Sequence, residues 1–222
     1  MSAVLFGSIS TVADTSELQR QAFNQAFDAH GLGWEWDRPD YLAMLRTSGG
    51  QARIDDYAQA RGQAVDAKAV HETKSKIFQE SLATAPLTAR PGVADTIRGA
   101  KDQGLKVGLV TTTSRANISA LIEALSPDVS LEDFDVIVDS SSVGRPKPDP
   151  AAYSFALQSL GEDHGDCVAV EDNVDGVRAA LAAGLTCVAF PNENTAQHDF
   201  GAAERRVDRV SLEELQQLMA SA

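Results

Sequence analysis

The chain has 222 residues, of which 43% are apolar and 23% charged, and its 19 basic and 32 acidic residues give a formal net charge of −13. This excess of acid argues against nucleic acid or an anionic membrane as the main partner, although a local basic pocket still allows a phosphorylated small molecule. No apolar run approaches the ~18 residues of a membrane span and no signal peptide is apparent, so we expect a cytoplasmic protein with one large domain or two unequal ones.

The apolar run Val4–Phe6 is the first expected strand, and it ends in a loop of small residues, Gly7–Thr11. Asp14 and Glu17 have the spacing of a capping box, which predicts a helix from about Thr15. A strand that stops just before a helix ends at the carboxyl edge of an open α/β sheet, where ligands bind. Because this loop carries no ionisable group, we expect the first strand to bring little chemistry to that edge.

Helical periodicity then continues without a strand pattern between Val12 and Leu87. The expected helices are about Thr15–His30, Asp40–Thr47, Gly50–Ala60 and Asp66–Leu82. Trp34 and Trp36 flank a turn between two of them, and we interpret their rings as packing anchors rather than as a ligand cage. The region therefore reads as a helical insertion behind the first strand.

From about Gly92 the rhythm changes to alternating helices and short strands. The expected strands are Leu105–Val110, Phe134–Val138, Val168–Val170 and Thr186–Phe190, with a short edge strand at Val207–Val210. Ser211 is expected to cap a final helix. Strands joined through helices of this length imply right-handed crossovers and a parallel sheet.

Two cysteines, Cys167 and Cys187, open two of these strands. We interpret them as buried thiols that pack as small hydrophobic side chains. A disulfide between them is the minor alternative.

Two further loops carry groups suited to an anion. Thr111–Ser114 offers hydroxyls and a helix N-terminus, whose backbone N–H groups and dipole favour negative charge, although such hydroxyls often serve only as caps. In Gly144–Pro150 three prolines surround Lys147 and stiffen its backbone, which would aim its ammonium group toward a phosphate. A solvated surface lysine is the alternative interpretation.

Adjacent carboxylates follow the expected strand at Val168–Val170. Glu171 and Asp172 would repel each other at the mouth of a sheet unless a cation lay between them. A hard, oxygen-ligated ion such as Mg²⁺ is the natural candidate.

These segments, taken in order, resemble the four motifs of the haloacid dehalogenase superfamily. The matching segments are Val4–Thr15, Thr111–Ser114, Lys147–Pro150 and Val170–Gly176. The helical insertion resembles the four-helix cap of the β-phosphoglucomutase and phosphoglycolate phosphatase branch. Within it, Arg46–Gly50 and Lys74–Lys76 resemble the sugar-bisphosphate phosphatases of that branch. The resemblance implies an α/β, Rossmannoid three-layer core with a parallel sheet at residues 1–14 and 85–222, and an inserted cap domain at residues 15–84.

The resemblance also implies roles for individual residues. Thr111 and Thr112 would bind a phosphoryl group, and Lys147 would neutralise it. Glu171 and Asp172 would hold Mg²⁺, directly or through water. Cap residues vary with substrate, and the candidates for contact with its distal part are Gln19, Arg53 and Lys74.

The first motif departs sharply from the family pattern of two aspartates separated by one residue. Gly7 stands at the position of the first, which is the family's nucleophile and a metal ligand, and Ile9 stands at the position of the second, its general acid/base. Ser8 is expected to point to the opposite face, because side chains alternate along a strand, and Ser10 has no evident base. We therefore expect a weakened Mg²⁺ site and a site that lacks its catalytic pair.

Three hypotheses follow. The first is a catalytically impaired phosphatase homologue that binds inorganic phosphate or a small phosphorylated metabolite such as a sugar phosphate, and acts as a sensor or as the partner of another protein. The second is an active Mg²⁺-dependent hydrolase that uses a non-standard route. The third is a scaffold without a ligand. The sequence leaves a monomer and a dimer equally open.

Overall fold

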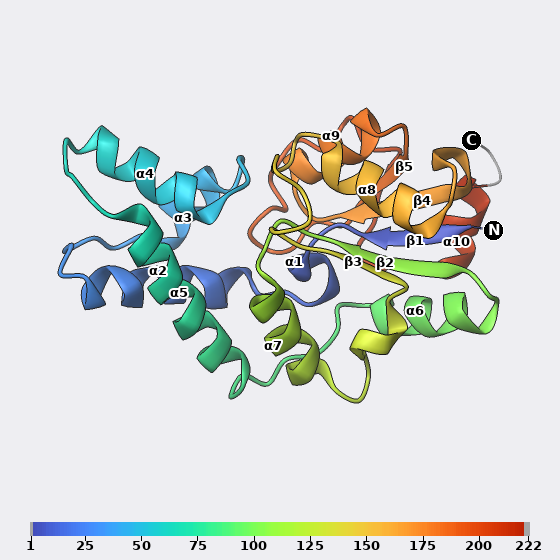
Figure 1. The fold of residues 1–222 in the computed structure, drawn as a ribbon, viewed down its shortest axis with the longest axis horizontal. Coiled ribbons are helices and arrows are strands. Elements are labelled where there is room, and N and C mark those ends of the chain that lie inside the picture. Colours follow the sequence, from blue (N-terminus) through green and yellow to red (C-terminus); the bar gives the residue numbers. More distant parts are fainter. Residues whose placement is uncertain (1, 220–222) are drawn as a thin grey trace.

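The computed structural model describes residues 2–219, in which six parallel strands form one sheet in the order β3-β2-β1-β4-β5-β6 (Figure 1). The strands are β1 (Ala3–Phe6), β2 (Lys106–Val110), β3 (Val136–Val138), β4 (Cys167–Glu171), β5 (Thr186–Ala189) and β6 (Arg205–Arg206). The chain passes from β1 outward to β3 and then returns to β4 on the other side of β1. This reversal of strand order places a crevice at the carboxyl ends of the central strands, where open α/β sheets bind ligands.

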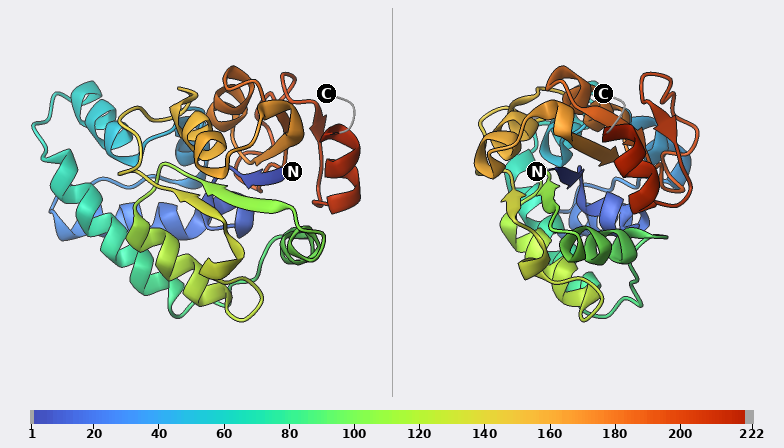
Figure 2. Two further views of the ribbon diagram at one scale, coloured as in Figure 1. Left: turned by 45° about the vertical axis from the view of Figure 1, so that its right-hand side comes forward. Right: turned by 90° about the vertical axis from the view of Figure 1, so that its right-hand side faces the viewer.

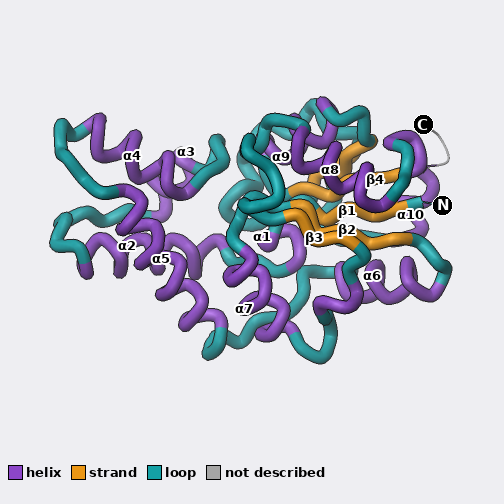
Figure 3. The backbone as a smooth tube through the Cα atoms, viewed as in Figure 1, coloured by secondary structure: helices purple, strands orange, loops and turns teal. Residues whose placement is uncertain are grey.

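Helices cover both faces of the sheet because its central strands are apolar on both sides (Figure 2). Val4 and Phe6 of β1 pack with α6 (Val93–Asp102), α7 (Arg115–Leu125) and α10 (Leu212–Met219) on one face. Ala3 and Leu5 pack with α8 (Ala151–Leu160) and α9 (Val174–Ala182) on the other. The resulting three layers, with the strands in the middle, are also clear in Figure 3.

Four further helices lie beyond the carboxyl edge of the sheet, and we call them the cap helices (Figure 1). They are α2 (Ser16–Ala29), α3 (Arg38–Met44), α4 (Gly50–Ala60) and α5 (Ala67–Leu82). They enclose a core of their own, in which the Phe27 ring meets the rings of Trp34 and Trp36 edge to face at centroid distances of 5.3 and 4.6 Å. Both tryptophans are buried, as expected for packing anchors.

The α/β fold predicted from the sequence is confirmed, and differences are confined to its margins. The edge strand β6 pairs at Arg205–Arg206 rather than at Val207–Val210, because the backbone N–H groups of Glu204 and Val207 already bond to β5. A short helix that the sequence did not predict, α1 (Ile9–Val12), follows β1. The boundaries proposed for two domains, at residues 14/15 and 84/85, stay a prediction.

Cys167 and Cys187 are buried free thiols, so the interpretation as hydrophobic side chains holds over the disulfide. Burial raises the pKa of Cys167 to about 11, which keeps this thiol protonated and unreactive. Within residues 2–219, no helix combines the length and the apolar character that crossing a bilayer requires.

Candidate functional site

A cavity of about 700 Å³ lies between the carboxyl edge of the sheet and the cap helices. Its sheet-side wall is made mainly of short polar side chains, with Ile9 as an apolar member and Asp172 as its carboxylate; the residues are Ser8, Ile9, Ser10, Thr111, Thr112, Thr113, Ser114, Asn117, Ser140, Asp172, Asn173, Asn192 and Thr195. Ser16, at the start of α2, lines the cavity next to them. Its cap-side wall carries the basic side chains, Arg53, Lys68, His71, Lys74 and Lys76, together with Glu72. The cavity therefore has one cationic end and one end rich in hydroxyl and amide groups.

The loop after β1 turns at once into helix α1, with Ser8 as its N-cap. The Ser8 hydroxyl accepts a hydrogen bond from the Thr11 backbone N–H at 3.0 Å and donates one to Asp172 Oδ1 at 2.7 Å. The expectation that Ser8 points away from the site is wrong, because strand alternation ends at Phe6 and Ser8 lines the cavity. Gly7 and Ile9 leave no carboxylate in this loop.

Glu171 occupies the space that a side chain at position 7 would need. An ideal Cβ built on Gly7 would lie 2.1 Å from Glu171 Cδ and 2.5 Å from the Tyr153 hydroxyl. The Glu171 side chain is fully buried, and its Oε1 accepts hydrogen bonds from Lys147 Nζ at 2.6 Å and from the Tyr153 hydroxyl at 2.7 Å. Burial raises the pKa of Glu171, while the ammonium group of Lys147 opposes this rise.

Lys147 is directed at this buried cluster rather than at the cavity. Besides Glu171, its Nζ donates to the carbonyl oxygens of Gly7 at 2.5 Å and Val110 at 2.7 Å. An ammonium group has three donors, and all three are used within the protein. The predicted contact of Lys147 with a phosphate therefore requires Lys147 to leave these partners.

Asp172 faces the cavity and is held in place by neutral donors. Its Oδ1 accepts from Ser8 and from Asn173 Nδ2 at 3.1 Å, and its Oδ2 accepts from Asn192 Nδ2 at 2.9 Å. Asn192 also accepts from the backbone N–H groups of Asn194 and Thr195 through its Oδ1, which fixes its orientation. Asp172 thus lies on the cavity wall with no Lys or Arg of the described core residues lining the cavity beside it, although it interacts electrostatically with Arg90 behind the wall.

These residues do not fit the magnesium site that the sequence led us to expect. Mg²⁺ prefers octahedral oxygen ligation, usually with one or two carboxylates in contact. Glu171 Oε2 has no hydrogen-bond partner but lies against Gly176, where an added Cβ would meet it at 2.2 Å, so it does not face Asp172 across an open space. Among residues 2–219, no three His, Cys, Asp or Glu side chains gather as a metal site. Joint ligation by Glu171 and Asp172 stays a prediction that needs Glu171 to turn.

The loop after β2 supplies the hydroxyls that the sequence predicted for an anion. Thr111 and Thr112 both line the cavity, and the Thr111 hydroxyl accepts from the Thr113 backbone N–H at 3.2 Å. Ser114 caps α7 by accepting from the Asn117 N–H at 3.3 Å. These hydroxyls are partly used as caps, and their role as phosphate ligands stays a prediction.

Arg53, His71 and Lys74 of the cap helices form a cluster of basic groups that makes no ion pair with a carboxylate of residues 2–219. Lys74 is 3% exposed; its Nζ donates to Gln19 Oε1 at 3.0 Å and lies over the rings of Phe23 and Phe78 at 4.8 and 4.9 Å. Burial, followed by repulsion from Arg53, lowers the pKa of Lys74 to about 7. Gln19, Arg53 and Lys74, predicted as cap candidates, are thus brought together at one end of the cavity.

Arg53 and His71 complete this cluster. Arg53 donates from Nε to the Met44 carbonyl at 3.2 Å and from Nη2 to the Thr47 carbonyl at 2.8 Å, and burial lowers its pKa. Burial, then repulsion from Lys74 and Arg53, lowers the pKa of His71 to about 4. The pKa values of all three basic groups are lowered, so a bound anion would stabilise their positively charged forms.

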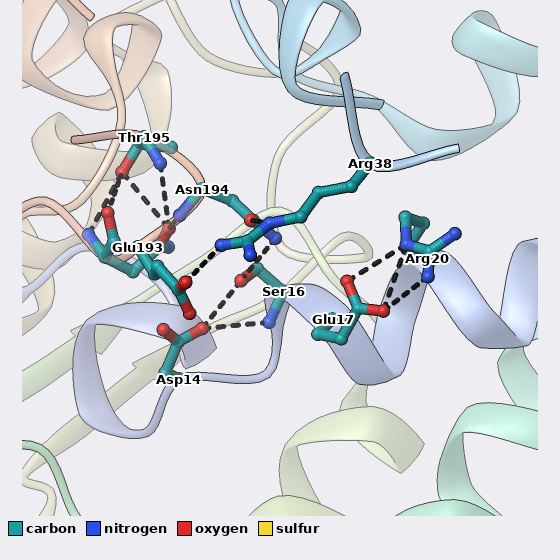
Figure 4. Close-up of polar contacts among 9 residues, drawn as sticks. Asp14, Ser16, Glu17, Arg20, Arg38, Glu193, Asn194 and Thr195 are labelled. Atoms are coloured by element: carbon teal, nitrogen blue, oxygen red, sulfur yellow. Dashed lines mark hydrogen bonds and ion pairs between the residues drawn. The ribbon is translucent and has the colours of Figure 1, made fainter. Parts of the chain in front are cut away.

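Several polar contacts hold the cap helices against the core at the rim of the cavity (Figure 4). Arg38 of α3 donates to Asn194 Oδ1 at 3.1 Å and forms an ion pair with Glu193. Asn194 Nδ2 donates to the Ser16 hydroxyl at 2.9 Å, at the start of α2. On another side, the Ser48 backbone N–H donates to an oxygen of Asp175 at 2.9 Å. The cavity is therefore formed by both parts of the chain together.

Four residues of this site were missed from the sequence: Ser8, Tyr153, His71 and Asn192. Tyr153 lies in α8, one turn after the prolines that follow Lys147. Its position six residues after Lys147 could have indicated that the two side chains lie near each other. Ser8, His71 and Asn192 gave no signal of their own, because single polar residues in loops and helices are common. Their roles appear only once the chain has folded.

Comparison with known proteins supports the same fold. The sequence pattern of the haloacid dehalogenase-like hydrolases matches residues 1–184. Protein CbbY of Rhodobacter capsulatus is 40% identical over 214 residues, which cover 95% of this chain and 94% of that protein.

Two crystal structures of CbbY from Rhodobacter sphaeroides superpose closely, each with 37% identity and coverage of 94% of both chains. One is a complex with phosphate, at a TM-score of 0.87. The other is a mutant in complex with xylulose-(1,5)bisphosphate, at a TM-score of 0.88.

Proposed function

This chain belongs to the haloacid dehalogenase-like hydrolase family, and on that premise we propose that it binds a sugar phosphate in its cavity and hydrolyses it very slowly or not at all. The observation that carries the proposal is the contrast between the two ends of the cavity. Its cap end concentrates Arg53, His71 and Lys74 without a carboxylate partner. Its core end has neither of the two aspartates by which the family attacks phosphorus.

The absence of the two aspartates at Gly7 and Ile9 is expected to lower the rate of catalysis rather than the affinity for a ligand. Loss of a covalent nucleophile that acts with its partners as a unit lowers the rate by on the order of 10⁶, and loss of general acid/base help by roughly 10²–10⁴. The two losses need not multiply. A buried cationic end, by contrast, binds an anion whether or not the core can react with it. Related CbbY proteins have been crystallised with phosphate and with xylulose-(1,5)bisphosphate, which supports a phosphorylated sugar as the ligand class.

Binding and turnover are tested separately. Calorimetry with a panel of pentose and hexose phosphates is expected to show binding by the unmodified chain. Arg53→Gln and Lys74→Met are each expected to weaken it about ten- to hundredfold, since a hydrogen bond to a charged group contributes about 1.5–3 kcal/mol. Lys101→Gln, which removes a cation from an ion pair on α6, is the matched control and should leave affinity unchanged. If no phosphate ester binds, the proposal fails.

The pH dependence of binding gives a second test. With a pKa of about 7, Lys74 is protonated below pH 7 and loses its charge above it in the free protein. A bound anion favours the charged form, so affinity should fall by up to about tenfold per pH unit as the pH rises above 7. The groups that face Lys74 are Arg53 on α4, His71 on α5 and Gln19 on α2; the pKa of His71 is about 4, below this range, and the Gln19 amide does not ionise.

Calorimetry between pH 7 and 9 measures this decline, a range in which a phosphate ester keeps its full charge because its second pKa is about 6. Lys74→Arg keeps a positive charge throughout, and its affinity should be flat over the same range. A decline of equal size in both proteins would contradict the assignment to Lys74.

A second candidate function is a slow hydrolase, and the contact between Ser8 and Asp172 favours it. The Ser8 hydroxyl faces the cavity and donates to a carboxylate at 2.7 Å. In this route the Ser8 oxygen attacks phosphorus while the P–O bond to the sugar breaks, and Asp172 takes the Ser8 proton and passes it to the departing sugar oxygen. Water then attacks the phosphoserine, which releases inorganic phosphate and restores the serine hydroxyl. Phosphate release by the unmodified chain that disappears in Ser8→Ala, with binding retained, would establish this function in place of the first.

A further inference from the structure

The core end of the cavity differs from the cap end in charge as well as in composition. Every lysine and arginine that lines the cavity belongs to α4 or α5; these are Arg53, Lys68, Lys74 and Lys76. The core wall carries one charged side chain, Asp172, which is negative. Lys147, the cation nearest to this wall in the family pattern, is 5% exposed and does not line the cavity.

Lys147 is turned into the core, where the absence of a side chain at Gly7 leaves room for Glu171 to reach it. Where an aspartate would stand, the Glu171 carboxylate approaches the Gly7 backbone so closely that an added Cβ would lie 2.1 Å from it. From there Glu171 Oε1 reaches Lys147 Nζ at 2.6 Å, and the Tyr153 hydroxyl adds a second hydrogen bond to the same oxygen. One positive and one negative side chain thus compensate each other inside the core.

We propose that Glu171 replaces the missing first-motif aspartate as the buried counter-ion of Lys147. The core end of the cavity consequently receives the uncharged, hydroxyl-bearing end of a sugar monophosphate. The phosphate of this ligand lies at the other end of the cavity, against Arg53 and Lys74. This inference rests on the proposed function. The inference goes beyond the proposed function because it specifies how many phosphates the ligand carries and how the ligand is oriented. In this orientation the sugar hydroxyls meet the short hydroxyl and amide side chains of the core wall.

A second phosphate at the core end would meet unfavourable charge. Its nearest ionised neighbour on the wall is Asp172, whose oxygens are held toward the cavity by Ser8 and Asn192. Two unit charges 4 Å apart at an effective dielectric constant of 20 to 80 interact by about 1–4 kcal/mol. A bisphosphate should therefore bind about fivefold to several hundredfold more weakly than the matching monophosphate, since 1.4 kcal/mol corresponds to tenfold.

The test is calorimetry of the unmodified chain with a pentose 5-phosphate, the matching 1,5-bisphosphate and the free pentose, without and with Mg²⁺. The expected order is monophosphate tightest, bisphosphate about fivefold or more weaker, and free pentose unbound. If the bisphosphate binds as tightly as the monophosphate or more tightly, the inference is overturned while the proposed function stands. If no phosphate ester binds, the proposed function itself fails.

A variant isolates the role of Glu171. Glu171→Gln keeps the size and a hydrogen-bonding oxygen but removes the charge that compensates Lys147, so the ratio of bisphosphate to monophosphate affinity should rise by about tenfold or more. Glu72→Gln is the matched control, because it removes one carboxylate from the cap side of the cavity. An unchanged ratio in Glu171→Gln, with a cooperative melt that shows a folded protein, would contradict the assignment of Glu171 as counter-ion.

Discussion

Replacing Gly7 and Ile9 by aspartate together is expected to raise phosphate release from sugar phosphates by about 10²–10⁴ over that of the unmodified chain. The substitutions restore a carboxylate nucleophile at the end of β1 and a general acid/base two residues later. The ends of β1, β2 and β4 lie side by side at that edge of the sheet, and Thr111 and Asp172 line the cavity there. We expect only part of the ~10⁶ attributed to a nucleophile to return, since supporting groups have rearranged.

The position of Glu171 beside Gly7 is the main obstacle to restoring activity. A side chain at position 7 collides with the Glu171 carboxylate and the Tyr153 hydroxyl. Glu171 is the far end of a flexible side chain and can swing away, which would free Lys147 and bring Glu171 nearer to Asp172. Adding Tyr153→Phe to the double variant removes one colliding atom and should increase turnover further.

Turnover is measured as released phosphate with Mg²⁺ present, across the same sugar phosphates used for binding. The matched control is Gly7→Asn/Ile9→Asn, which introduces side chains of nearly the same size without a carboxylate and should remain inactive. Rapid Mg²⁺-dependent release by the unmodified chain, comparable with that of the aspartate variant, would show that its first motif is not impaired.

Much of this structure could be predicted from sequence periodicity. The apolar runs that became β1, β2 and β4 are buried on both faces, and such strands are typical of parallel sheets flanked by helices. Caps predicted the helix starts only in part. Ser114 accepts a backbone N–H in the first turn of α7, whereas the capping box expected at Asp14 and Glu17 does not form, because Thr15 is the N-cap of α2 and Glu17 bonds to Arg20. The order of loops along the chain then sufficed to bring Thr111 and Asp172 to one cavity.

The direction of individual side chains could not be predicted in the same way. Ser8 faces the cavity because the chain leaves its strand one residue earlier than alternation requires. Lys147 and Glu171 were expected at the ligand, yet they bond to each other in the core. The pairing of Lys147 with Glu171 depends on the void left by the missing side chain at Gly7, and a void is a property of packing that no residue pattern encodes.

The ion pair between Lys147 and Glu171, which occupies this void, is expected to contribute strongly to the stability of the fold. Either Lys147→Met or Glu171→Leu alone is expected to lower the free energy of unfolding by about 3–5 kcal/mol, because each leaves a buried charge without its partner. After Lys147→Met, the fully buried Glu171 keeps only the Tyr153 hydroxyl. After Glu171→Leu, the ammonium group keeps two backbone carbonyls, of Gly7 and Val110.

The double variant Lys147→Met/Glu171→Leu is expected to be far more stable than the sum of the single effects predicts, because replacing a whole buried pair by apolar side chains is often neutral or stabilising. Urea unfolding of the four proteins, compared at equal m-values, measures the coupling. Lys101→Met, which breaks an ion pair with Asp135 that is about one-third exposed, is the matched control and should cost no more than about 1 kcal/mol. Purely additive effects would mean that Glu171 and Lys147 are not partners, and the carboxylate beside Gly7 would then be free to serve the ligand.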